Sequence, residues 1–214
     1  MSDLVQVIVG LVVGYLVGTV PNADLVARLA SRGRVDLRRE GSGNPGGLNV
    51  ARVLGKRWGL LVIVLDAAKG AIAGFVGLAM GDAGAYAAGT AVIGGHCWPV
   101  WTGFRGGKGV AAAGGSFFSA FPPMLPIDGF FTGAVALVTR NSRVAMRSAV
   151  VFWVAASVLW WAADLPMWWG PAPGPGLVAY SMLGGAMLLV RFYVSDRGRD
   201  GATDPRVESP GPSD

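Results

Sequence analysis

The chain alternates between long stretches of apolar residues and shorter polar connections. Most of the apolar stretches have a length near the ~20 residues that an α-helix needs to cross a bilayer; the first is longer, and the fourth and fifth are shorter. The stretches cover residues 4–30, 58–80, 84–101, 110–125, 126–139, 148–166 and 175–193. This pattern predicts an all-α integral membrane protein with seven transmembrane helices, whose termini lie on opposite sides of the membrane.

The composition favours a membrane protein over a soluble domain. Hydrophobic residues make up 52% of the 214 positions and charged residues only 14%, whereas a soluble domain carries roughly 25% charge. The 34 glycines suit close packing between helices. Gly10, Gly14 and Gly18 recur every four residues in the first apolar stretch. We expect them to pack against another helix of this chain rather than against a second copy.

The basic residues lie in alternate connections. Of the 18 Lys and Arg residues, all but Lys69 fall in or next to the first, third and fifth connections or after the last apolar stretch. The positive-inside rule then predicts that the N-terminus is outside and the C-terminus is cytoplasmic. Residues 1–194 form the predicted membrane domain. Residues 195–214, rich in Pro, Gly, Asp and Ser, form a predicted disordered cytoplasmic tail.

The net charge of +5 requires no nucleic-acid partner, because topology and attraction to anionic lipids account for most of the basic residues. His96 and Cys97 are the only residues of their kinds. A single cysteine excludes an intrachain disulfide, and a single histidine argues against a His-rich metal site.

The first connection contains a glycine-rich polar loop, residues 35–52. Its glycines allow the backbone to approach a ligand closely, and its Ser and Asn side chains offer neutral hydrogen-bonding groups. An arginine adds a planar guanidinium that suits phosphate oxygens. The candidate residues are Gly41, Ser42, Gly43, Asn44, Asn49 and Arg52. The alternative is a flexible connection, because loops are often rich in these residue types.

A second glycine-rich loop, residues 94–109, contains His96 and Lys108. Backbone N–H groups next to glycine suit an anion, and the lysine adds positive charge. The loop is not a Walker P-loop, since Thr102 stands in place of its first glycine. The glycines around the lysine are Gly106, Gly107 and Gly109. Two such loops on one face of a membrane protein indicate phosphate chemistry at the membrane surface.

Two charged residues lie inside the second apolar stretch. Asp66 and Lys69 are three residues apart, on neighbouring faces of a helix. At 1.5 Å per residue they lie roughly 12–17 Å beyond Trp58, well inside the hydrocarbon. They either neutralise each other and hold helices together, or serve the site directly.

Several short strings occur in order and with compatible spacing over roughly residues 14–115. The strings are Gly18-Thr-Val-Pro21, Asp36-Leu-Arg38, Gly41-Ser-Gly-Asn44, Asn49-Val-Ala-Arg-Val-Leu-Gly55, Asp66-Ala-Ala-Lys-Gly70, Gly95-His96 and Phe104-Arg-Gly-Gly-Lys-Gly-Val110. In these strings the chain resembles the bacterial acyl-phosphate-dependent glycerol-3-phosphate acyltransferases, the PlsY family.

The resemblance implies a seven-helix protein of the plasma membrane with its active site on the cytoplasmic side. The implied reaction transfers a fatty acyl group from acyl phosphate to the 1-hydroxyl of glycerol 3-phosphate, giving lysophosphatidic acid for phospholipid synthesis. The partners are then these two substrates and membrane lipids, and neither acyl-CoA, a metal nor another cofactor is expected. An acyl phosphate is already activated, so the site mainly has to hold two phosphates and orient a hydroxyl.

The resemblance also assigns residues. Ser42, Arg52 and Lys108 map to the phosphate pocket and are, with His96, the candidate catalytic residues. His96 either takes the proton of the hydroxyl or orients a loop, in which case a substrate phosphate oxygen takes the proton. The candidate substrate-binding residues are Gly41, Gly43, Asn44, Asn49, Lys69, Gly106, Gly107 and Gly109.

The chain departs from the family pattern at three places. Leu48 replaces a threonine of the first loop, and the family's Arg-Tyr-x-Ser becomes Arg140-Asn-Ser-Arg143. The C-terminal motif His-x-x-Asn-x-x-Arg-Leu is missing, and Arg191-Phe-Tyr-Val-Ser-Asp-Arg-Gly-Arg199 stands in its place. A divergent relative with another acceptor, or a non-catalytic lipid-phosphate binder, is therefore an alternative. An anion transporter is a third, but its charges would spread through the bilayer.

Overall fold

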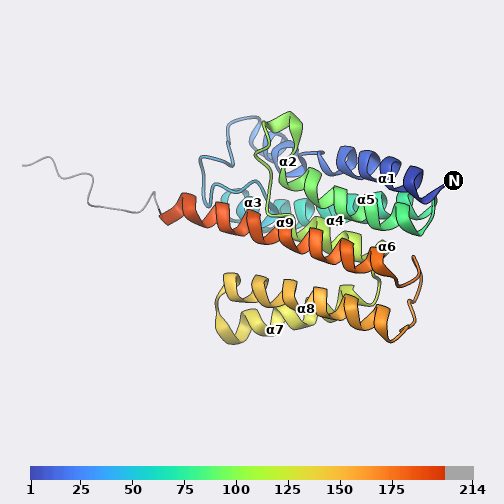
Figure 1. Cartoon of the computed structure of the whole chain (residues 1–214). Helices are drawn as coiled ribbons and strands as arrows, with labels where there is room; N and C mark the ends of the chain where they lie inside the picture. Colours follow the sequence, from blue (N-terminus) through green and yellow to red (C-terminus); the bar gives the residue numbers. More distant parts are fainter. Residues whose placement is uncertain (201–214) are drawn as a thin grey trace, which may run out of the picture.

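The structure is a computed structural model that describes residues 1–200, with side chains through residue 195. Within that part of the chain every regular element is a helix, and the helices lie roughly side by side in a bundle (Figure 1). The elements are α1 (Asp3–Gly18), α2 (Asn22–Ser31), α3 (Gly47–Leu54), α4 (Lys56–Leu78), α5 (Asp82–Cys97), the 3-10 turn η1 (Val100–Thr102), α6 (Val110–Ala120), α7 (Met124–Thr139), α8 (Ser142–Ala162) and α9 (Pro175–Asp200).

All of the predicted apolar stretches are helical, but the first one is broken. α1 ends at Gly18 and α2 begins at Asn22, with Pro21 between them. Proline has no N–H to donate to the preceding turn, and it disfavours helical backbone at the residue before it. The chain therefore turns at this point instead of continuing as one helix to residue 30.

The predicted stretch 110–125 forms a shorter helix, α6, whereas α7 begins two residues before the predicted stretch 126–139. α6 ends at Ala120, and a turn at residues 121–123 leads into α7. The 11 residues of α6 rise about 16 Å, roughly half of a hydrocarbon core of ~30 Å. In the described residues, four helical segments are long and apolar enough to cross a membrane: Asp3–Ser31, Lys56–Leu78, Ser142–Ala162 and Pro175–Ser195.

The glycines of α1 pack against α5 of the same chain, as predicted. A Cβ at Gly10 would lie 2.8 Å from the carbonyl oxygen of Gly84. At Gly14 and Gly18 an added Cβ would overlap the backbone of α5. Only glycine lets the two backbones approach this closely, so the every-fourth-residue pattern is a helix–helix contact inside one chain.

The last helix is longer than the last apolar stretch. α9 continues to Asp200, so the first six residues of the predicted disordered tail, 195–200, are helical. The remaining residues of that prediction, 201–214, lie outside the described residues. The helix therefore extends the bundle beyond its apolar part.

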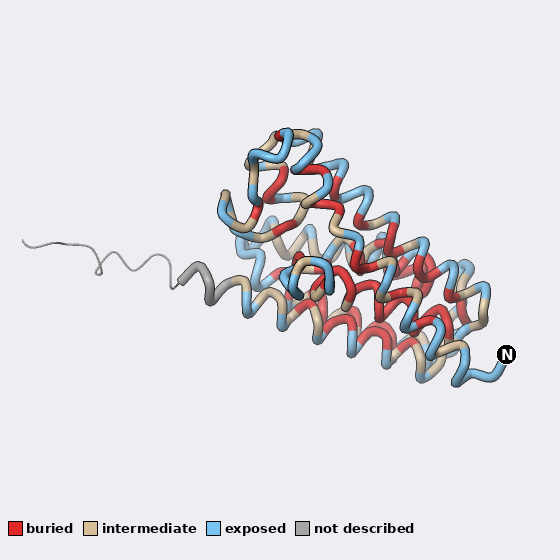
Figure 2. The backbone as a smooth tube through the Cα atoms, turned by 90° about the horizontal axis from the view of Figure 1, so that it is seen from above, coloured by how far each residue is buried: buried red, intermediate tan, exposed pale blue. Residues whose placement is uncertain are grey.

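The α7–α8 hairpin lies along one edge of the bundle, next to α9 (Figure 1). Trp153 of α8 packs the hairpin against α6 and α9, since its ring centroid lies 4.7 Å from that of Phe117 and 5.1 Å from that of Tyr180. The hydroxyl of Tyr180 is 2.6 Å from that of Ser116. Buried positions follow the inward faces of the helices (Figure 2), while large apolar side chains such as Leu137 point outward, as lipid contact requires.

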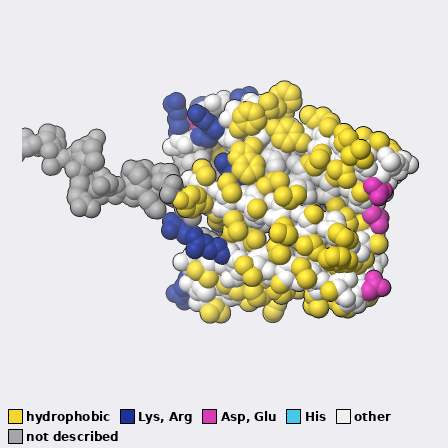
Figure 3. Space-filling model, viewed as in Figure 1, with side chains coloured by type: hydrophobic (Ala, Val, Ile, Leu, Met, Phe, Trp, Pro, Cys, Tyr) yellow, Lys and Arg dark blue, Asp and Glu magenta, His cyan; other side chains and the backbone are white. Residues whose placement is uncertain are grey.

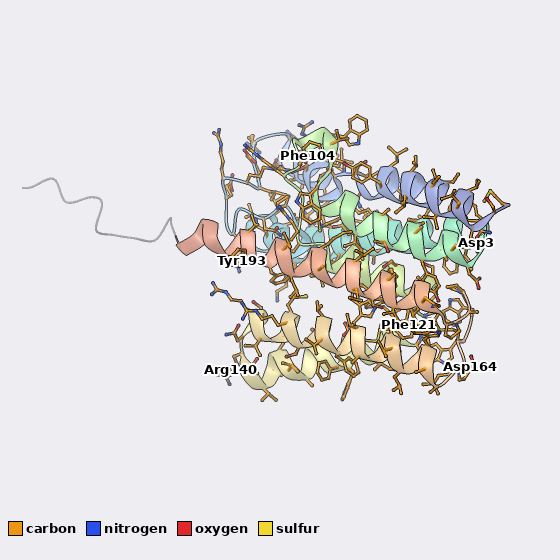
Figure 4. All side chains as sticks on the ribbon, viewed as in Figure 1. Asp3, Phe104, Phe121, Arg140, Asp164 and Tyr193 are labelled. Carbon is orange, nitrogen blue, oxygen red and sulfur yellow. The ribbon has the colours of Figure 1, made fainter. Side chains whose placement is uncertain are left out.

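The two ends of the bundle carry opposite charge. Lys and Arg side chains gather at the end where α9 finishes, and acidic side chains gather at the other end (Figure 3). Arg140 and Tyr193 lie at the basic end, and Asp3 and Asp164 lie at the acidic end (Figure 4). The glycine-rich loops lie at the basic end as well (Figure 1).

Candidate active site

Two loops meet at the basic end: the first loop (residues 32–46, between α2 and α3) and the second loop (residues 98–109, between α5 and α6). Arg38 of the first loop donates from Nη2 to the carbonyl of Arg105 at 2.7 Å. Gly107 packs so closely on the first loop that a Cβ there would lie 2.8 Å from the carbonyl oxygen of Pro45. The loops therefore form one structural unit.

Asn49, at the start of α3, shapes the first loop. Its Nδ2 donates to the carbonyls of Leu37 and Glu40 at 3.1 and 3.0 Å, and its Oδ1 accepts the N–H of Ser42 at 2.7 Å. The side chain is buried, and Gly41, at φ +61°, leaves no room there for a Cβ. The amide of Asn49 is thus committed to the loop, so we assign it to shaping the backbone that carries Ser42.

The glycines of the second loop allow close packing against the end of α5. The N–H groups of Gly106 and Gly107 donate to the carbonyls of Cys97 and His96, both at 3.2 Å. An added Cβ at Gly106 would overlap the carbonyl oxygen of His96, and one at Gly107 would overlap its ring. These two N–H groups therefore hold the loop in place, a different use from the anion contact that the glycine pattern suggests.

A buried polar cluster lies beneath the loops. Asp66 and Lys69 of α4 form an ion pair at 3.0 Å, and both side chains are buried. Asn22 donates to the same Asp66 oxygen at 3.1 Å, and the ammonium of Lys69 donates to the carbonyl of Val20 at 2.9 Å. The break at Pro21 therefore supplies two partners of this pair. Mutual neutralisation, the first of the two expected roles, is confirmed.

His96 lies between this cluster and the second loop. Its Nδ1 is 3.4 Å from Asp66 Oδ1, at a geometry that makes no hydrogen bond, and that nitrogen is buried without a hydrogen-bond partner among the described residues. The opposite edge of the ring abuts Gly107. His96 therefore packs between a carboxylate and the loop that carries Lys108.

The cluster opens into a small pocket of about 20 Å³, which is room for roughly one water molecule. Asp66, Lys69 and His96 line it together with parts of both loops. The other lining residues are Gly18, Val20, Pro21, Asn22, Ala23, Asp24, Arg38, Pro45, Pro99, Gly106 and Gly107. Lys69 thus lines the pocket while it is paired, so both roles expected for it are compatible.

The three residues assigned to the phosphate pocket lie outside this lining. Ser42 is half-buried, Arg52 is exposed on α3, and Lys108 is half-buried with its Nζ 4.0 Å from the ring centroid of Phe192. The polar side chains of the small pocket are therefore a separate group from these three residues, although Gly106 and Gly107, which line the pocket, directly precede Lys108.

Two arginines of the site, Arg38 and Arg191, are not among the residues that the sequence predicted for it. Arg38 pairs with Asp24 through two hydrogen bonds of 2.7 and 3.0 Å, which raise the pKa of its guanidinium. Arg191 of α9 donates to the carbonyls of Gly106 and Gly107. Arg38 lies in one of the strings that carry the family resemblance, which is a usable signal, whereas Arg191 looks like any basic residue that follows a membrane helix.

These features define a membrane protein with a cation-rich site made of two glycine-dependent loops, which suits a phosphorylated substrate. Residues 8–195 match the family model described as glycerol-3-phosphate acyltransferase. The chain belongs to this family and is accordingly a membrane acyltransferase of phospholipid synthesis.

Individual relatives agree. The chain is 45% identical to the glycerol-3-phosphate acyltransferase of Laribacter hongkongensis over 156 residues, which are 70% of this chain and 77% of that protein. For the enzyme of the same name from Synechococcus sp. the identity is 41% over 144 residues, or 66% of this chain and 69% of that protein.

Solved structures extend the likeness to the whole bundle. Crystal structures of PlsY, an integral membrane glycerol 3-phosphate acyltransferase, superpose with a TM-score of 0.70 for its glycerol 3-phosphate form, at 30% identity and 94% coverage of both chains. For its lysophosphatidic acid form the TM-score is 0.72, at 29% identity and coverage of 91% and 92%.

Proposed function

We propose that this protein transfers a fatty acyl group from acyl phosphate to the 1-hydroxyl of glycerol 3-phosphate. The hydroxyl oxygen bonds to the acyl carbonyl carbon, the carbon–oxygen bond to the phosphate breaks, and inorganic phosphate and lysophosphatidic acid leave. The observation that carries this proposal is the contact between the two glycine-rich loops at the basic end, where Arg38 bonds the carbonyl of Arg105 and Gly107 packs on Pro45, because the reaction brings two phosphates together.

We assign Ser42, Arg52 and Lys108 to the substrate phosphates, and the polar side chains of the small pocket to placement of the loops. Arg52 is exposed and Lys108 half-buried, so both cations can reach a substrate phosphate, and Ser42 lies on the backbone that Asn49 holds. Lys69, by contrast, is already bonded to Asp66 and Val20. It also lines the small pocket, so its charge contributes to the field there.

The packing of His96 favours its positioning role. One ring nitrogen faces Asp66 and the other edge abuts Gly107, so the ring supports the second loop from below. The proton of the attacking hydroxyl then passes to an oxygen of the acyl phosphate, which leaves as phosphate. This keeps the proton balance within the two substrates.

A cavity of about 210 Å³, lined mainly by apolar residues but also by Asp128 and Thr132, lies between α6, α7, α8 and α9, and we assign it to the acyl chain. It begins beside Val110, two residues after Lys108, and beside Leu188 of α9. A smaller engineered apolar cavity of roughly 150 Å³ stays dry and binds benzene, so the volume of this cavity and the apolar part of its lining suit hydrocarbon. The acyl carbonyl would lie at the end near Lys108.

We further propose that all seven apolar helices cross the plasma membrane, with the N-terminus outside and the active site in the cytoplasm. The charge separation between the ends supports this orientation (Figure 3), and thinning of the bilayer accommodates the short helices. Single cysteines introduced at Ser2 and Ser142 in a Cys97→Ala background test it. A membrane-impermeant maleimide added to intact cells should label position 2 and spare position 142, and the opposite labelling would refute the orientation.

The function itself is tested with purified protein in detergent, palmitoyl phosphate and labelled glycerol 3-phosphate. Labelled lysophosphatidic acid should form with equimolar release of phosphate. No product from folded protein would refute the proposed reaction. Product with a different phosphorylated acceptor only would favour the divergent relative with another acceptor.

A further inference from the structure

The end of α9 lies against the second loop, in the segment where the family's C-terminal motif is missing. Arg191 donates from Nε to the carbonyl of Gly107 at 3.1 Å and from Nη2 to the carbonyl of Gly106. Its guanidinium also lies 5.9 Å from the ring centroid of Trp98. A planar guanidinium that bonds two successive carbonyls fixes both the position and the orientation of that peptide segment.

The next residue of α9 contacts the lysine itself. The Nζ of Lys108 lies 4.0 Å from the ring centroid of Phe192, well within the ~6 Å range of a cation–π interaction. An ammonium held over a ring face has a preferred place, and a long flexible lysine without such a surface would sample many. The Phe192 ring therefore favours one position of the Lys108 ammonium.

The same loop is held from its other side by α5. Gly106 and Gly107 donate their N–H groups to the carbonyls of Cys97 and His96, and the carbonyls of the two glycines accept hydrogen bonds from Arg191. All four backbone polar groups of this dipeptide are thus bonded, and the residue that follows it is Lys108. The backbone of Lys108 therefore starts from a fixed position beside the pocket that Gly106 and Gly107 line.

We propose that Arg191 and Phe192 are positioning residues for acyl transfer, Arg191 for the peptide that carries Lys108 and Phe192 for its ammonium. The inference rests on the proposed function, in which Lys108 contacts a substrate phosphate. Neither residue needs to touch the substrate. Their effect on the reaction passes through the placement of one cation, and misplacement by about 1 Å costs on the order of 100-fold in rate.

Steady-state kinetics with palmitoyl phosphate test the role of the ring. Phe192→Leu keeps an apolar side chain but removes the ring, and it should lower kcat by 10- to 100-fold. Phe192→Tyr keeps the ring and should stay within about twofold of the unmodified protein. Equal loss in both variants, or no loss in Phe192→Leu, would overturn the proposal. Thermal unfolding in detergent checks that both variants are folded.

The arginine is tested with a matched pair of charge removals. Arg191→Met should lower kcat by 10- to 100-fold. Arg191→Lys keeps the charge but loses the planar guanidinium, so its kcat should lie between those of Arg191→Met and the unmodified protein. Arg147, exposed on α8 at the same end, provides the control, since Arg147→Met should leave kcat unchanged. A similar loss in Arg147→Met and Arg191→Met would show that only total charge counts, and would reject a positioning role.

A second readout does not depend on activity. The chain contains three lysines, Lys56, Lys69 and Lys108, so reductive methylation with ¹³C-formaldehyde gives few NMR signals, and Lys108→Arg assigns the one of interest. That signal should lie upfield because of the Phe192 ring current, lose the shift in Phe192→Leu and keep it in Phe192→Tyr. If the unmodified protein transfers no acyl group, the proposed function fails and this shift still tests the positioning. An unshifted Lys108 signal would overturn the inference itself.

Discussion

The half of the bundle that holds the site and the α7–α8 hairpin are built in opposite ways. α1, α4, α5 and α6 touch through glycine, and at Gly14 or Gly115 even a Cβ would overlap a neighbouring backbone. Along the hairpin side, Gly114, Gly129 and Gly133 have open space around them, and the cavity of about 210 Å³ lies there. The helices of the first half therefore pack without free volume, whereas the hairpin side has space for a ligand.

The contrast suits a reaction between a charged head and an apolar chain. The phosphate site depends on loops whose backbone must keep its position, and closely packed helices provide that rigidity. The acyl chain carries no group to be oriented, so an apolar slot with spare volume suffices for it. Four substitutions test this division.

The largest expected effect is on the packed half. Gly14→Leu would force a side chain into the backbone of Ala88, which cannot move aside as a flexible side chain would. We expect a loss of about 3 kcal/mol or more of stability, at the upper end of overpacking effects. Gly133→Leu, where nothing lies within 4 Å, is the control and should change stability by less than about 0.5 kcal/mol. Thermal unfolding in detergent measures both. Equal unfolding midpoints for the two variants would show that the two parts of the bundle do not differ in packing.

A loss of similar size is expected when the buried ion pair is broken. Asp66→Asn leaves the Lys69 ammonium buried without its counter-charge, which costs about 3–5 kcal/mol when a buried pair is broken. The double variant Asp66→Asn with Lys69→Met removes both charges and should recover much of that stability. Thermal unfolding separates the cases. A double variant no more stable than Asp66→Asn would mean that the lost counter-charge is not what destabilises Asp66→Asn.

His96 has a smaller expected effect on rate. If the ring only supports the second loop, His96→Gln, which keeps a polar side chain of similar length, should reduce turnover by about tenfold or less. Loss of a general base typically costs 10²–10⁴-fold. Turnover with saturating palmitoyl phosphate distinguishes the two, and a thousandfold loss in folded protein would assign the proton to His96.

The smallest expected effect is a change in the preference for acyl-chain length. Gly129 lines the apolar cavity and has open space beside it, so Gly129→Leu should fill part of the slot without disturbing the fold. We expect the ratio of kcat/KM for palmitoyl over decanoyl phosphate to fall about three- to tenfold, the range typical of hydrophobic pocket discrimination. Gly133→Leu on the same helix should leave the ratio unchanged. An unchanged ratio in Gly129→Leu would place the acyl chain elsewhere.

Sequence periodicity and charge predicted most of the architecture. Helices depend on local composition, so the apolar stretches located all of the long ones, and the glycines of α1 located a helix contact because small residues every four positions form a stripe. Pro21 and Asn141 set local ends that hydropathy alone missed. α1 and α2 separate at the proline, and Asn141 accepts the N–H groups of Arg143 and Val144, which starts α8 six residues before its apolar stretch.

The site was predictable only in part. The resemblance located both loops and the cluster around Asp66, but it could not show how the loops are held. Asn49 bonds residues 9 and 12 positions before it, and Arg191 bonds carbonyls more than 80 positions before it. Such contacts depend on the register of helices far apart in the sequence, and a carbonyl acceptor carries no side-chain signature at all.

The central claim is that the loop around Lys108 contacts a phosphate during acyl transfer. Turnover of palmitoyl phosphate and labelled glycerol 3-phosphate by Lys108→Ala, compared with Lys108→Arg and the unmodified protein, tests it most directly. A charge-assisted contact to a transferring phosphate contributes about 2–4 kcal/mol, or roughly 30- to 1,000-fold in rate. We expect a loss of that size in Lys108→Ala and a smaller one in Lys108→Arg, both with unchanged thermal unfolding. Normal turnover by folded Lys108→Ala would contradict the claim.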